Sequence, residues 1–119
     1  MATNHYVTNK VLYEEIVKCK DASIVTAEIL DMFTLMSKKI SLKHKFWVEE
    51  DRQDVVMGGI EDAWRYFDRF DPSKGTNAFA YVTSIIYNGQ QKAWRSIYNY
   101  YKKADQPVIH VTLNNNFSL

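Results

Sequence analysis

Apolar residues recur with the period of an α-helix through most of the chain, most clearly in the segment IVTAEILDMFTLMSKKI. Steps of one, three and four residues place its apolar side chains on one stripe of a helix. This stripe consists of Val25, Ile29, Met32, Phe33, Met36 and Ile40. Ser23 precedes the stripe and is a suitable N-cap, because its hydroxyl can accept a bond from a backbone N–H of the first turn. We expect this helix to lie mostly in the core.

Two further segments with the same period flank this helix. In the first, TNKVLYEEIVKCK, Thr8 is the candidate N-cap, and a shorter apolar stripe follows it: Val11 or Leu12, Ile16 and Cys19. In the second, helical spacing extends from about residue 49 to residue 69. Its apolar positions are Val56, Ile60, Ala63, Trp64 and Phe67. The pattern therefore predicts three helices before the first proline.

The sequence DPSKG interrupts the helical period. Pro72 fixes its own backbone angle, and Gly75 has the conformational freedom that a tight turn requires. Thr76 or Asn77 can cap the next segment, which keeps a helical period to about residue 104, whereas the remainder has β-branched residues and a run of asparagines. We therefore predict an all-α fold, with a compact bundle of about four helices in residues 1–104 and an extended or flexible tail in residues 105–119.

Composition limits the classes of protein to consider. A chain of 119 residues is the size of one domain. No apolar run approaches the roughly 18 residues of a membrane span, and the start MATNHYVTNK lacks the apolar core of a signal peptide, so we expect a soluble intracellular protein. Cys19 has no second cysteine to pair with, and His5, His44 and His110 are far apart. With no metal-ligand spacing, nucleophile–base pair or phosphate-binding glycine loop, we expect neither an enzyme nor a cofactor or metal.

Charge is distributed unevenly, although the net charge is only +1. Residues 49–71 carry 3 basic and 8 acidic side chains, whereas residues 72–104 carry 5 basic side chains, 7 aromatic ones and no acidic one. An acidic helix is thus followed by a basic, aromatic helix. Segregated charge on the solvated faces of an ordinary helical protein is the alternative explanation.

The predicted fourth helix has two different faces at about 100° per residue. One is apolar: Val82, Ile86, Ala93 and Ile97, with Gly89 beside them. The other combines amides, cations and a tyrosine: Tyr81, Asn88, Lys92, Arg95 and Asn99, with Ser84, Gln91 and Lys102 at its edges. Lys and Arg neutralise phosphates, Asn and Gln bond base edges, and Tyr stacks on an unpaired base. This face favours nucleic-acid binding over two alternatives, a protein-binding surface and a solvated face without special function.

The segment DVVMGGIEDAWRYFDRFDPSKGTNAFAYVTSIIYN resembles the second conserved region of bacterial sigma factors, in which an acidic helix leads through a basic, glycine-containing turn to an aromatic-rich helix. It is more similar still to the sigma-like late-transcription factors of tailed bacteriophages. The resemblance runs without a gap from Gln53 to about Lys103 and extends more loosely to the preceding helix. It implies a dissociable factor that binds the host RNA polymerase core and melts a short AT-rich, minus-ten-type late promoter element, in the cytoplasm and on the nucleoid of the bacterial host.

In that family the acidic helix packs on the clamp helices of the largest polymerase subunit. The resemblance therefore implies polymerase-binding roles for Asp54, Met57, Gly58, Glu61 and Trp64. An aromatic such as Trp64 is a common interface anchor, and burial beside Phe67 is its alternative role. Gly58 and Gly59 each cost about 1 kcal/mol relative to alanine inside a helix, so we expect another helix, from the partner or from this chain, to approach closely there.

The resemblance gives the aromatic helix a role in binding promoter DNA, including the unpaired non-template strand. Tyr81 takes the place of the aromatic that captures the flipped adenine, and Tyr87 and Asn88 that of residues at the upstream edge of the element. The DNA-binding residues that we expect are Tyr81, Ser84, Tyr87, Asn88, Gln91, Lys92, Arg95, Lys102 and Lys103.

The chain also departs from the primary sigma factors. They have a tryptophan pair where this chain has Ser84 and Ile85, so support of the fork junction would need a substitute such as Trp94 or Tyr98. We expect recognition of the short AT-rich element only, without a minus-thirty-five contact. Two classes remain open beside this interpretation: a small helical DNA-binding regulator or single-strand-binding protein acting without polymerase, and a helical scaffold that binds only protein.

In the phage late factors a short hydrophobic C-terminal peptide contacts the replication sliding clamp. The ending VTLNNNFSL has three spaced apolar residues that fit contact with a sliding clamp or co-activator: Leu113, Phe117 and Leu119. A frayed tail is the alternative.

Overall fold

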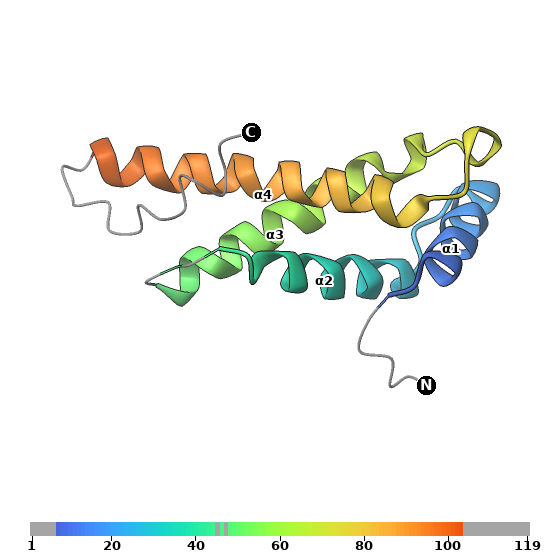
Figure 1. Cartoon of the computed structure of the whole chain (residues 1–119), viewed down its shortest axis with the longest axis horizontal. Helices are drawn as coiled ribbons and strands as arrows, with labels where there is room; N and C mark the ends of the chain where they lie inside the picture. Colours follow the sequence, from blue (N-terminus) through green and yellow to red (C-terminus); the bar gives the residue numbers. More distant parts are fainter. Residues whose placement is uncertain (1–6, 45, 47, 104–119) are drawn as a thin grey trace.

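The computed structural model describes residues 7–44, 46 and 48–103, and the regular structure in these ranges is entirely helical. The helices are α1 (Asn9–Ala22), α2 (Ala27–Ser41), α3 (Glu49–Tyr66) and α4 (Ala78–Lys103), and two short 3-10 helices, Phe67–Arg69 and Pro72–Lys74, join α3 to α4. Figure 1 shows α4 along the length of the molecule, α3 crossing it obliquely, α2 below and α1 across one end. The predicted all-α fold is therefore confirmed for this part of the chain. The expected tail, with Leu113, Phe117 and Leu119, lies outside the described residues.

The start of α1 is as predicted, whereas the start of α2 is not. Thr8 caps α1 by accepting a hydrogen bond from the N–H of Val11 at 3.4 Å. Ser23 ends α1 instead of starting α2: its φ of 55° is left-handed, and its N–H reaches back to carbonyls of the last turn. Thr26 is the N-cap of α2, accepts from the N–H of Ile29 at 3.2 Å and donates to the carboxylate of Glu15 at 2.6 Å. The true cap thus also ties α2 to α1.

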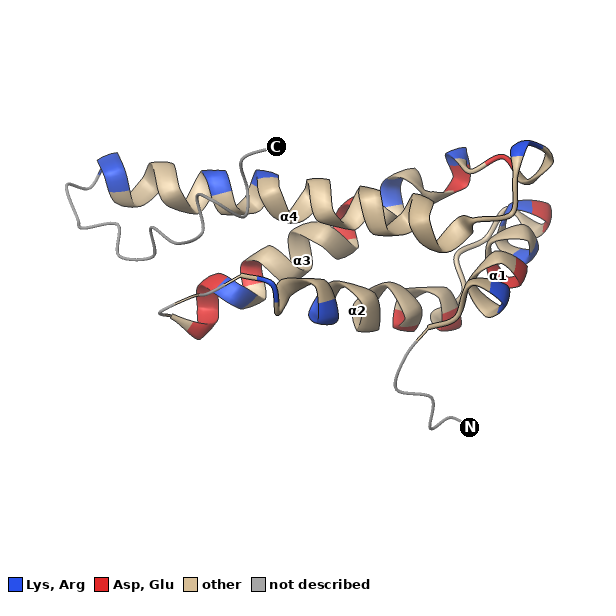
Figure 2. Ribbon diagram, in the orientation of Figure 1, with Lys and Arg blue, Asp and Glu red and all other residues tan. Residues whose placement is uncertain are grey.

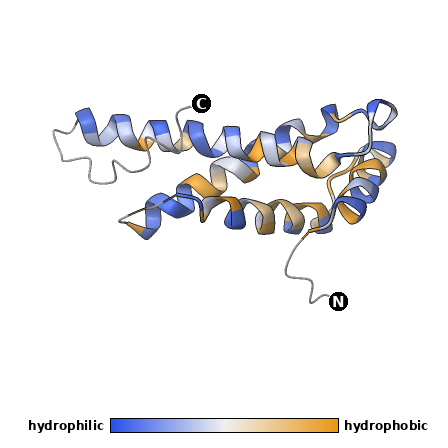
Figure 3. Cartoon of the chain, in the orientation of Figure 1, coloured by the Kyte–Doolittle hydropathy of each residue, from blue (hydrophilic) through white to orange (hydrophobic). Residues whose placement is uncertain are grey.

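The predicted stripes form the core. Leu12, Ile16 and Cys19 of α1 meet Ile29, Phe33 and Met36 of α2 and the apolar face of α4, and Figure 3 shows hydrophobic residues along α2 and around the crossing of α3 and α4. Two predicted stripe residues are exceptions: Val25 is exposed because it lies before the first turn of α2, and Trp64 of α3 is half-exposed. No helix in the described ranges combines the length and the hydropathy that crossing a membrane requires.

Glycines allow α3 to lie directly on α4, its main packing partner. A Cβ atom at Gly58 would lie 2.9 Å from that of Ala93 and 3.1 Å from the carbonyl oxygen of Gly89. A Cβ at Gly89 would lie 2.6 Å from the carbonyl oxygen of Gly58. The close approach expected at Gly58 is therefore confirmed, and the approaching helix belongs to the same chain. The side of Gly58 expected to meet polymerase faces α4.

A buried polar contact joins three helices beside this crossing. The Gln90 side chain donates from Nε2 to the Ser37 carbonyl and to Ser37 Oγ, both at 2.8 Å, and Ser37 Oγ donates to the Val56 carbonyl at 2.8 Å. A Cβ at Gly59 would lie 2.6 Å from Ser37 Oγ. Because buried polar groups need partners, this network fixes the register of α2, α3 and α4.

The start of α4 is fixed by two asparagines. Asn77 Oδ1 accepts from the N–H of Ala80 at 3.0 Å, so Asn77 is the cap among the two candidates. Asn9 in α1 accepts from the N–H of Phe79 at 2.9 Å and donates to the Thr76 carbonyl at 3.0 Å. Free N–H groups of the first turn are thereby satisfied, and α1 is joined to the start of α4.

His44 is buried after α2, with its ring stacked on Tyr87 at 6.1 Å between centroids and edge-on to Phe46 at 6.3 Å. The pKa of His44 is lowered from 6.5 to about 4, mainly by burial. A hydrogen bond with Gln90 raises the pKa, whereas the positive charge of Arg52 lowers it further. The imidazole is therefore neutral at pH 7 in the folded protein.

Mild acid is expected to destabilise the fold through His44. Between the pKa of about 4 in the folded state and 6.5 in the unfolded state, the unfolded chain binds more protons, so stability falls as pH falls through this window. The loss should be about 2 kcal/mol between pH 7 and pH 5, measured by urea unfolding. His44→Gln should lose about 2 kcal/mol less than the wild type over the same interval. Equal losses in the two proteins would contradict the assignment to His44.

Candidate nucleic-acid interface

A hollow of about 480 Å³ lies between the end of α3 and the polar face of α4. We call it the α3/α4 groove and define it by its lining residues: Asp62, Tyr66, Arg69, Tyr81, Ile85, Asn88, Gln91, Lys92 and Arg95. Five residues predicted to bind DNA are therefore brought together here: Tyr81, Asn88, Gln91, Lys92 and Arg95. Figure 2 shows basic residues at intervals along the second half of α4 and acidic residues in the first turn of α3.

Tyr81 is half-buried at one end of the groove. Its ring packs against the ring of Phe70, with centroids 5.4 Å apart and planes at 53°, and Phe70 is held edge-on by Tyr13 at 5.9 Å. The core thus fixes one side of the tyrosine while another part lines the groove. An aromatic held in this way loses little conformational entropy when a second ring stacks on it.

The groove holds one carboxylate among its cations. Asp62 Oδ2 lies 2.8 Å from Lys92 Nζ, and the Asp62 side chain is 9% exposed whereas that of Lys92 is 55% exposed. Arg69 and Arg95 are exposed, and the Arg69 guanidinium lies over the Tyr66 ring at 4.7 Å. Lys92, expected to contact phosphate, is therefore already paired within the protein.

The other predicted DNA-binding residues lie elsewhere. Ser84 and Tyr87 line a second hollow, of about 640 Å³, together with Ile40, Lys43, His44 and Thr83. Lys102 and Lys103 are exposed in the last turn of α4, where cations also stabilise the helix dipole. A DNA strand that contacted all of the predicted residues would therefore have to cross α4, from the α3/α4 groove to the second hollow.

The outer face of α3 carries four of the five residues predicted to bind polymerase. Asp54 and Glu61 are exposed, and the side chains of Met57 and Trp64 are 55% and 52% exposed. Phe67 is only 4% exposed, so the alternative role considered for Trp64, burial beside Phe67, is not observed. Trp64 lines a hollow of about 720 Å³ with the exposed residues Ile24 and Val25 of the α1–α2 connection. A mixed acidic and apolar surface thus lies on the side of α3 that is not covered by α4.

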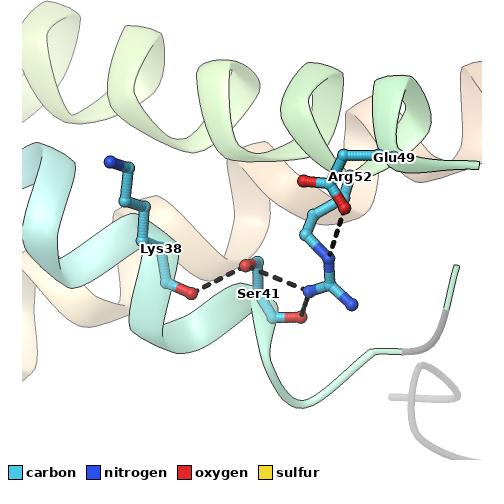
Figure 4. Close-up of polar contacts among 4 residues, drawn as sticks. All are labelled: Lys38, Ser41, Glu49 and Arg52. Carbon is cyan, nitrogen blue, oxygen red and sulfur yellow. Dashed lines mark hydrogen bonds and ion pairs between the residues drawn. The ribbon is translucent and has the colours of Figure 1, made fainter.

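Polar contacts fix the first turns of α3 against α2. Figure 4 shows Arg52 donating from Nη1 to the Ser41 carbonyl at 2.9 Å, while its Nε lies 3.7 Å from Glu49 Oε1. Ser41 Oγ donates to the Lys38 carbonyl at 2.7 Å. At the other side, Tyr101 of α4 donates its hydroxyl to Asp51 Oδ2 at 2.8 Å. Glu49 and Asp51 at the start of α3 thus bind partners within the protein. Asp54 and Glu61, in contrast, are exposed.

Trp94 cannot replace the missing tryptophan pair at the surface. It is 6% exposed and packs with Val55 in a second core cluster, and Tyr98 stacks on it with centroids 5.2 Å apart and planes at 19°. Helical position explains this outcome, since Trp94 lies on the side of α4 that faces the start of α3 and not on the polar face. Tyr98 remains half-buried beside it.

Four residues of the groove were not predicted from the sequence: Ile85 of α4, and Asp62, Tyr66 and Arg69 from α3 and the turn after it. Asp62 follows Gly58 by one helical turn, and Lys92 follows Gly89 by three residues, so the two pairs meet once the glycines bring the helices together. The spacing of the glycines and charges would therefore have indicated this ion pair only if the crossing of α3 and α4 had been known.

No protein-family model, curated protein or solved structure matches the chain.

Proposed function

We propose that this chain is a sigma-like transcription initiation factor of a tailed bacteriophage, which binds the host RNA polymerase core through α3 and melts a short AT-rich promoter element. The observation that carries the proposal is the α3/α4 groove, which is lined in succession along α4 by Tyr81, Asn88 and Arg95, about 10 Å apart along the helix axis. These three groups suit successive parts of an unpaired strand: the face of one base, the edge of a neighbouring base and a flanking phosphate.

Strand opening extrudes a base from the stack at a cost of a few kcal/mol. Stacking on Tyr81 would offset about 1 to 3 kcal/mol of that cost, and the amide of Asn88 can pair with two atoms of an adenine. Arg69 and Arg95, both exposed at the groove, would neutralise the flanking phosphates. The groove would thereby favour the melted state of the promoter over the duplex.

The outer face of α3 suits a basic helical partner. Asp54, Met57, Glu61 and Trp64 follow steps of three, four and three residues, which place them on one face of a helix. Carboxylates steer a partner of opposite charge, and a half-exposed tryptophan can anchor the contact. This face and the groove use different residues, so polymerase and DNA can be bound at the same time. Through Leu113, Phe117 and Leu119, which lie outside the described residues, the tail would contact a sliding clamp.

The proposal is tested by adding the purified chain to polymerase core and an AT-rich promoter, and by following opening through permanganate reactivity of unpaired thymines. Opening that requires both core and chain supports it. Binding of the free chain to DNA at physiological salt, without association with core, would instead identify a small regulator or single-strand-binding protein.

Trp64→Ala is expected to weaken association with polymerase core by about 10-fold or more, because the side chain is a half-exposed interface anchor. The change should also lower the free energy of unfolding by about 1 kcal/mol or more, because about half of Trp64 is buried. Tyr100→Ala removes an exposed aromatic side chain from α4, outside this face, and is the control with a smaller expected effect. Unchanged core binding by Trp64→Ala would exclude the outer face of α3 as the docking surface.

A further inference from the structure

The ion pair between Asp62 and Lys92 is built into the crossing of α3 and α4. Gly89 has no side chain, and a Cβ there would lie 3.0 Å from the Cβ and 3.1 Å from the Cγ of Asp62. The carboxyl group of Asp62 can therefore lie against the backbone of α4, where Lys92 reaches it from one turn further along. The carboxylate is almost fully buried, and the lysine covers it from the groove side.

This arrangement changes the electrostatics of the groove. A phosphate that approached Lys92 within contact distance would also come within a few ångströms of the Asp62 carboxylate. Two like charges about 4 Å apart repel by about 1 kcal/mol in water and by about 4 kcal/mol at the dielectric typical of a protein surface. Lys92 is thus poorly available to phosphate, whereas the exposed guanidinium groups of Arg69 and Arg95 form no ion pair with the residues that the structure describes.

We infer that Asp62 is a specificity-determining residue of the α3/α4 groove: its carboxylate neutralises Lys92 and keeps phosphate away from the groove floor, so that the groove takes an unpaired base in preference to a duplex backbone. A base is uncharged and its ring can stack on Tyr81, whereas a duplex offers mainly phosphates at its surface. This inference rests on the proposed function, because it presupposes DNA in the groove.

Asp62→Asn tests the inference with a side chain of the same shape. Losing the carboxylate frees Lys92 for one additional phosphate contact, so the slope of log K against log salt should steepen by about 0.9 for duplex and about 0.7 for single strands. At low salt, binding to duplex should strengthen by about 5- to 10-fold, and the preference for single-stranded over duplex DNA should fall. The probes are a fluorescein-labelled AT-rich single strand and its duplex, titrated with the full chain over a series of KCl concentrations.

Two variants separate this effect from simpler ones. Asp31→Asn removes the same charge from an exposed position on α2 and should leave the slope unchanged. In the double variant Asp62→Asn/Lys92→Gln no lysine is released, so the steeper slope should disappear. A slope in Asp62→Asn equal to that of Asp31→Asn, or a steeper slope that persists in the double variant, would overturn the inference.

Arg95→Gln tests the groove itself, independently of Asp62. Weaker DNA binding by this variant together with no effect of Asp62→Asn would reject the inference and leave the proposed function in place. Unaltered binding by Arg95→Gln would show that DNA does not occupy the groove and would reject both. No binding to either probe by any of these proteins would reject the inference, and promoter opening with polymerase core would then decide the proposed function alone.

Discussion

Gly89→Ala is expected to lower the free energy of unfolding by about 2 kcal/mol or more, although alanine is the better helix former by about 1 kcal/mol. The added methyl group would lie 2.6 Å from the Gly58 carbonyl oxygen, and 3.0 Å from the Cβ of Asp62. Backbone atoms cannot rotate away, so α3 and α4 would have to separate. Overpacking of this kind typically costs about 1 to 3 kcal/mol and occasionally more, which outweighs the gain in propensity.

Urea unfolding followed by circular dichroism measures this change. Ser96→Ala, at an exposed position of the same helix, is the matched control and should be neutral or slightly stabilising. Separation of the helices should also disturb the Asp62–Lys92 pair and with it the α3/α4 groove. Gly89→Ala that is as stable as Ser96→Ala would show that α3 does not pack on α4 as closely as the structure has it.

Tyr81→Ala is expected to reduce promoter opening by roughly 10- to 100-fold in the presence of polymerase core, corresponding to the loss of about 1 to 3 kcal/mol of stacking. Association with core should be nearly unaffected, because Tyr81 belongs to the groove and not to the outer face of α3. Both steps can be measured on the same preparation, opening by permanganate reactivity and association by fluorescence titration of core.

Two controls separate stacking from packing. Tyr81→Phe keeps the ring and should retain most of the opening activity. Tyr13→Ala removes another tyrosine that packs against Phe70, at 5.9 Å compared with 5.4 Å for Tyr81, but it lies on α1 and outside the groove. If Tyr13→Ala impaired opening as much as Tyr81→Ala, the effect would come from the core around Phe70 and not from contact with DNA.

Hydropathy pattern and local chemistry predicted the helices well, because both act within a few residues of each other. Thr8 was correctly identified as a cap, and the stripes in α1 and α2 are buried. Ser23 was wrongly assigned because a second capping residue, Thr26, lies three residues later and the pattern does not say which of them starts the helix. Ser23 has its own role, in the left-handed position that ends α1.

The candidate site could be predicted only where it lies on one helix. Tyr81, Asn88 and Arg95 were grouped from helical geometry, and they do share a groove. The contribution of α3 depends on how two helices cross, so Asp62 and its pairing with Lys92 could not be obtained from the pattern of one helix. Ser84 was placed at the edge of the polar face by helical geometry, and Tyr87 was assigned to DNA by the resemblance, but the packing of α2 places both in another hollow.

Capture of an unpaired base by the α3/α4 groove, while α3 holds the polymerase, is the step on which the proposed function depends. It is tested most directly with promoters that carry 2-aminopurine at successive positions of the AT-rich element, because the fluorescence of this base rises when it leaves the stack. Core and chain together should raise the fluorescence at one position, and Tyr81→Ala should abolish this rise while core remains bound. No rise at any position, or a rise that Tyr81→Ala leaves intact, would contradict the capture of a base by the groove.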